Sequence, residues 1–143
     1  MTFSLKIPFL QRYLLFFIWL ILALSGLYFA YTQDWKMQDP SDFTVNVLKT
    51  HGISAAIFLV IFGSVIAVHI RIALNLKRNM LTGLSMLVLM SILALTGTGL
   101  YYSPEEWHEN IKWTHIWLGL ICIFWLPLHI WMGILLRKSK NIA

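Results

Sequence analysis

Four long apolar runs dominate the 143-residue chain, and they restrict it to folds that are solvated mainly by lipid. The runs cover residues 13–31, 51–74, 80–102 and 113–136. Each approaches or exceeds the ~20 residues that a helix needs to cross a bilayer. Only helices and closed barrels satisfy their backbone hydrogen bonds inside lipid, and these runs lack the alternating pattern of barrel strands. We therefore predict one all-α domain over residues 1–143, an integral membrane four-helix bundle.

The charges are few and unevenly placed. Hydrophobic residues make up 59% of the chain and charged residues 12%, with a net charge of +5. The basic residues lie in short clusters between the apolar runs, which is typical of membrane orientation and not of nucleic-acid binding. The basic start and the apolar stretch after it lack a small-residue cleavage site, so we expect a retained first span.

The connections between the runs predict the topology. The segments before the first run, between the second and third, and after the fourth contain basic residues and no acid. The other two connections contain all six acidic residues. Basic segments stay in the cytoplasm, so we predict that both termini are cytoplasmic and that the acidic connections face outward.

The second half of the chain repeats short motifs of the first half in the same order. The matched segments are Ser25-Gly26-Leu27-Tyr28 with Thr98-Gly99-Leu100-Tyr101, Thr50-His51 with Thr114-His115, and Val68-His69-Ile70 with Leu128-His129-Ile130. A repeat of this kind predicts two duplicated helical hairpins.

Four of the five histidines occupy equivalent positions in this repeat. His51 and His69 are about five helical turns apart. His115 and His129 are slightly less than about four turns apart, so the two histidines of each helix share one face. The second and fourth runs cross in the same direction. We therefore predict two pairs that join different helices, His51 with His115 near the outer surface and His69 with His129 near the inner surface.

Two facing imidazoles suit a planar haem iron that is held from both sides. The chain has a single cysteine and no Cys-x-x-Cys-His motif, so the expected cofactors are two non-covalent b-type haems. Two alternatives stay open. The histidines could serve helix packing, or they could bind zinc or copper, although such a metal would want more ligands at one depth.

Other residues are candidates for the same sites. Glycines allow a macrocycle to approach the backbone, and basic residues can pair with propionates. The candidates are Gly26, Gly97, Gly99, Gly119, Gly133, Lys49, Lys112 and Arg71. Helix packing explains each glycine equally well. His108, in the outer loop from Ser103 to Glu109, is either a solvated residue or a proton acceptor for quinol oxidation.

The segment from His115 through Gly119 to Leu128-His129-Ile130 resembles the haem-binding helix of bacterial di-haem b-type cytochromes. These are the membrane subunits of formate dehydrogenases and nickel–iron hydrogenases, and their small stand-alone relatives. The stretch from Thr96 to Tyr101 is similar to the helix that precedes that segment. The resemblance implies a four-helix core, two b haems, exchange with the quinone pool and a place in the bacterial inner membrane.

The expected function is a relay of single electrons between membrane quinone and a redox protein at the outer face. The chain could act alone, as a homo-oligomer or as a subunit of a larger complex. Two other functions stay open: a non-haem membrane subunit whose histidines pack or bind metal, and a quinone-linked oxidase that acts on a small redox substrate such as superoxide.

Overall fold

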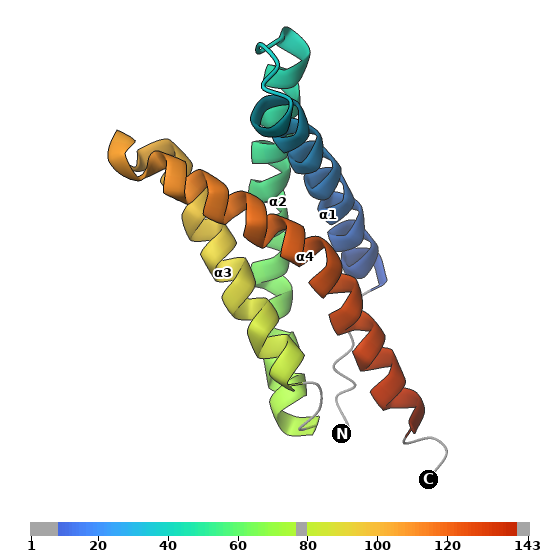
Figure 1. The fold of residues 1–143 in the computed structure, drawn as a ribbon. Helices are drawn as coiled ribbons and strands as arrows, with labels where there is room; N and C mark the ends of the chain where they lie inside the picture. The colour runs from blue at the N-terminus through green and yellow to red at the C-terminus, as the bar shows by residue number, and fades with distance from the viewer. Residues whose placement is uncertain (1–8, 77–79, 140–143) are drawn as a thin grey trace. The chain divides into compact units, whose positions relative to one another are not determined.

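The computed structural model describes the backbone of residues 9–76 and 80–139, and the side chains of residues 9–71 and 80–135. This part of the chain contains helices and no strand (Figure 1). The elements are α1 (Phe9–Phe29), the π-helix η1 (Ala30–Trp35), α2 (Asp42–Leu76), α3 (Met80–Tyr102) and α4 (Glu105–Ser139). Four helical segments are long and apolar enough to cross a membrane, which confirms the prediction of an all-α fold with four candidate spans.

The helix α2 begins well before its apolar run. Ser41 and Thr44 form a reciprocal cap, in which the Thr44 amide donates to Ser41 Oγ (3.2 Å) and the Ser41 amide donates to Thr44 Oγ1 (2.8 Å). Asp42 stands in the first turn, where a negative charge complements the helix dipole. The helix therefore begins about two and a half turns before His51, the first residue of the predicted span.

The helix α4 also begins before its apolar run. Glu105 and Glu106 occupy its first turn, where the helix dipole favours acidic side chains. Glu109 accepts a hydrogen bond from Trp113 Nε1 (2.7 Å) one turn later. The segment around His108 was expected to be an outer loop, and that expectation was wrong for residues from Glu105 onward, since they form the first turns of α4.

The first helix widens at its end. The Lys36 amide donates to the Tyr31 carbonyl at 3.0 Å, which closes a π-helical turn at the end of η1. Met37 follows with φ of 50°, in the left-handed region that stops a helix. Pro127 lies inside α4, which remains one helix on both sides of it.

The chain divides into two compact units between Ile72 and Ala73. In the first unit α1 lies beside α2, with Gln11 Nε2 donating to Ser64 Oγ at 2.7 Å. In the second unit α3 lies beside α4, with Trp125 Nε1 donating to Ser85 Oγ at 3.1 Å. Each unit therefore contains a pair of sequence-adjacent helices.

Candidate functional site

His51 points from α2 at the backbone of α1. Its Nδ1 lies 3.0 Å from the Leu22 carbonyl oxygen and 3.3 Å from Ser25 Oγ. A carbonyl oxygen can only accept, so Nδ1–H donates and the proton of the neutral imidazole is on Nδ1. The lone pair of the ring is then on Nε2, which is the nitrogen that could bind a metal.

His115 makes the same kind of contact from α4 to α3. Its Nδ1 lies 2.9 Å from Thr96 Oγ1. The single hydroxyl proton of Thr96 is directed to carbonyl oxygens of its own helix, Ile92 at 2.8 Å and Leu93 at 3.2 Å. With the proton so placed, Thr96 Oγ1 accepts from Nδ1–H, which leaves the lone pair of His115 on Nε2.

His129 repeats the contact further along α4. Its Nδ1 lies 2.9 Å from Thr82 Oγ1 of α3. His69 is exposed on α2. The structure thus describes the inter-helix contacts of three of the four predicted ligands.

A glycine follows each of the three hydroxyl residues, and we name these dipeptides the hydroxyl–glycine steps: Ser25-Gly26, Thr96-Gly97 and Thr82-Gly83. A Cβ placed on Gly26 would lie 2.6 Å from Cε1 of His51. On Gly97 it would lie 3.2 Å from Cε1 of His115, and on Gly83 it would lie 3.6 Å from Cε1 of His129. A side chain at Gly26 would therefore collide with the imidazole, one at Gly97 would crowd it, and one at Gly83 would make an ordinary contact.

The contacts change which residues match between the two halves. The sequence repeat paired Ser25-Gly26 with Thr98-Gly99, whereas His115 selects the step two residues earlier. Two residues turn a helix by about 200°, which moves a side chain to the opposite face. Thr98 Oγ1 donates to the Ala94 carbonyl at 2.8 Å, and a Cβ on Gly99 would lie 3.3 Å from Ile111, so Gly99 permits close packing of α3 on α4.

Sequence reasoning missed the step at Thr82-Gly83. A signal for it was present, because the two steps on α3 have the same separation in sequence as His115 and His129 on α4. Two antiparallel helices in contact keep such equal separations when the same kind of contact occurs twice along them.

The remaining candidates lie in different surroundings. A Cβ on Gly119 would meet no described atom within 4 Å, so space is open beside α4 one turn after His115. Lys112 forms an ion pair with Glu109 (2.9 Å) and lies 5.5 Å from the centre of the Trp113 ring. Gly133 is half-buried, and the exposed candidates are Lys49, Arg71 and His108. Lys112 therefore already has a carboxylate partner on its own helix.

Each unit offers an imidazole nitrogen of the kind that a haem iron takes. Among the residues that the structure describes, no three His, Cys, Asp or Glu side chains gather to hold a metal ion. His51 and His115 each carry the lone pair on Nε2, and a haem iron takes one such nitrogen on each side. The pairing of a histidine of one unit with a histidine of the other stays a prediction.

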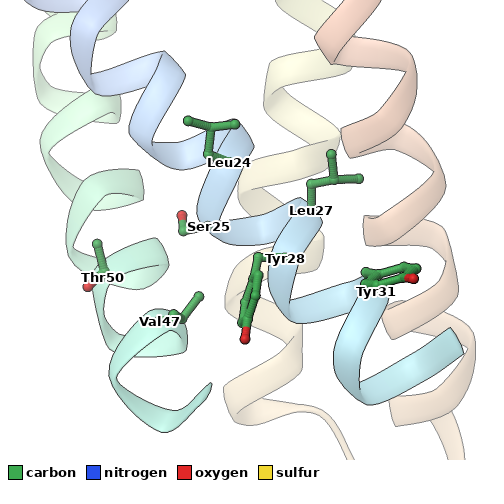
Figure 2. A pocket seen from close by; sticks show the side chains of 7 residues that line it. All are labelled: Leu24, Ser25, Leu27, Tyr28, Tyr31, Val47 and Thr50. Carbon is green, nitrogen blue, oxygen red and sulfur yellow. The ribbon is translucent and has the colours of Figure 1, made fainter. Parts of the chain in front are cut away.

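An apolar groove on the first unit is lined by residues of α1, η1 and α2 (Figure 2). Its lining residues are Leu24, Ser25, Leu27, Tyr28, Tyr31, Val47 and Thr50. Ser25 thus belongs both to the groove wall and to the contact with His51 Nδ1. The side chain of Ser25 would therefore lie between a molecule in this groove and the imidazole of His51.

No protein-family model, curated protein or solved structure matches the chain. Its function is therefore argued from its own residues.

Proposed function

We propose that this protein is a membrane di-haem b-type cytochrome that relays electrons between quinone and a redox protein at the outer face. The observation that carries the proposal is the common setting of His51, His115 and His129, each bonded through Nδ1 to a neighbouring helix at a hydroxyl–glycine step. Ionisable side chains within membrane spans are costly and usually functional. Histidines that bind metal characteristically have their second ring nitrogen bonded in this way.

The chain's own residues would orient the ligands. His51 with His115, and His69 with His129, would each hold one haem b, which supplies a one-electron carrier when bound. The hydroxyl–glycine steps would set the ring orientation before binding. Gly119 would leave room for a macrocycle beside His115, because its surroundings within the described residues are open. The four spans support a multi-pass location, which we propose is the bacterial inner membrane.

The apolar groove of the first unit supports the quinone part of the proposal. A quinone has a long apolar tail, and the lining of the groove is almost entirely apolar. We expect Leu27→Trp, which would fill the groove, to slow haem reduction by a short-chain quinol several-fold without changing the haem spectrum. Leu20→Trp is the matched control, since Leu20 is also exposed on α1 but lies outside the groove. Equal rates in both variants would remove the groove from the proposal.

Two measurements test the haem assignment. Purified protein should show b-type bands in a reduced-minus-oxidised spectrum, and pyridine haemochrome titration should give two haems per chain. Protein that folds without haem, or haem that resists acid–acetone extraction, would refute the proposal.

The four ligand variants test the pairing. We expect His51→Ala and His115→Ala to remove one redox component, and His69→Ala and His129→Ala to remove the other. His108→Ala is the control, because His108 is exposed and lies outside the repeat. Loss of the same component from the His51 and His69 variants would contradict the pairing.

A further inference from the structure

We propose that Thr96, and Ser25 together with the Leu22 carbonyl, are positioning groups that hold His115 and His51 with the proton on Nδ1 and thereby lower the reduction potential of the outer haem. This inference rests on the proposed function. It adds a role for residues that touch only the ligands, and it predicts that the two ligands of one haem depend differently on their hydroxyl neighbours.

The acceptors set the direction of the hydrogen bonds. The Leu22 carbonyl can only accept, so it receives the Nδ1 proton of His51. When Thr96 gives its own proton to the Ile92 carbonyl, its oxygen receives the Nδ1 proton of His115. Both rings would then present Nε2 to a haem iron. An acceptor on Nδ1–H also raises the basicity of the ligand, which favours ferric over ferrous iron.

The two contacts differ in what a mutation can remove. Thr96 Oγ1 is a side-chain atom, so Thr96→Val deletes this contact with His115 Nδ1 while keeping the shape of the side chain. His51 keeps the main-chain oxygen of Leu22 at 3.0 Å when Ser25→Ala deletes the weaker contact at 3.3 Å. The structure therefore predicts a large effect at Thr96 and a small one at Ser25.

The test is a redox titration of the purified holoprotein with its haem content. We expect Thr96→Val to change the relative affinity for ferric and ferrous iron about tenfold, which raises one midpoint potential by about 59 mV for one electron. Ser25→Ala should shift the same component less. Thr96→Ser should restore the wild-type potential, because a serine hydroxyl can make the same two bonds. Thr98→Val is the matched control, since Thr98 lies two residues along the same helix and bonds only its own backbone.

Each outcome decides the inference. Unchanged potentials in Thr96→Val, or an equal shift in Thr98→Val, would overturn it. Should Thr96→Val lose haem, retention in Thr96→Ser would support the hydroxyl as the positioning group, and loss in both would overturn it. Wild-type protein without haem would instead refute the proposed function, so the two failures are distinguishable.

Discussion

At the scale of single residues, the candidate site depends on small side chains as much as on histidines. Gly26 has no room for a methyl group, because a Cβ there would approach Cε1 of His51 to 2.6 Å. The imidazole is the end of a flexible side chain, so it can rotate away. A larger residue at this position should therefore disturb the ligand and not the helix.

We expect Gly26→Ala to leave the helical content unchanged and to weaken retention of the outer haem by about tenfold or more, as loss of ligand orientation typically does. Gly83→Ala is the matched control, because its Cβ would lie at an ordinary contact distance of 3.6 Å from Cε1 of His129. Haem content and circular dichroism of the two purified variants check the prediction. Equal haem retention in both would show that the glycine does not position the ring.

At the scale of elements, polar first turns extend two helices beyond their apolar runs. The Ser41–Thr44 cap starts α2, and Glu105 with Glu106 starts α4. Because each extension is helical, His51 and His115 are both preceded by helical turns. The helical backbone therefore continues on both sides of each histidine, which fixes the direction of its side chain better than a loop would.

Removal of the cap on α2 should destabilise that end of the helix. We expect Ser41→Ala to cost about 1 kcal/mol, because it leaves the Thr44 amide without its acceptor. Ser41→Asp should retain most of the stability, since aspartate also caps helices well. Thermal unfolding in detergent, followed by circular dichroism, measures both variants. A melting temperature for Ser41→Ala equal to that of the wild type would contradict a stabilising cap.

At the scale of the whole molecule, the charges predict how the chain sits in the membrane. We expect both termini in the cytoplasm, since the acidic residues all lie in the first and third connections between the predicted spans. A reporter that is active only in the periplasm should be inactive when fused after Ala143 and active when inserted after Ser103. The reverse pattern would refute the predicted topology.

The first turn of α4 is also where we expect a redox partner. Glu105 and Glu106 are exposed, whereas Glu109 is already paired with Lys112. Complementary charge mainly accelerates encounter, so replacing Glu105 and Glu106 by glutamine should slow electron exchange with a cationic partner such as a basic cytochrome. Stopped-flow rates should converge with the wild type at about 1 M salt, where screening is short-ranged. Unchanged rates at low salt would show that these acids serve topology alone.

The sequence by itself determined the number of spans and the histidine faces. An apolar run of about 20 residues specifies a membrane helix locally, and the 3.6-residue period places His115 and His129 on one side without knowledge of any neighbour. The helix ends were less predictable, because α2 and α4 begin with polar residues outside the apolar runs.

Only the tertiary structure decided what the histidines touch. Ser25-Gly26, Thr96-Gly97 and Thr98-Gly99 look alike in sequence, yet His115 contacts Thr96, while Gly99 packs against Ile111. The choice depends on the rotation and register of α3 against α4, which arise from many contacts between the two helices. The sequence pattern alone cannot distinguish the hydroxyl–glycine dipeptides at Thr96 and Thr98. The packing of α3 against α4 selects which face of α3 meets the imidazole of His115.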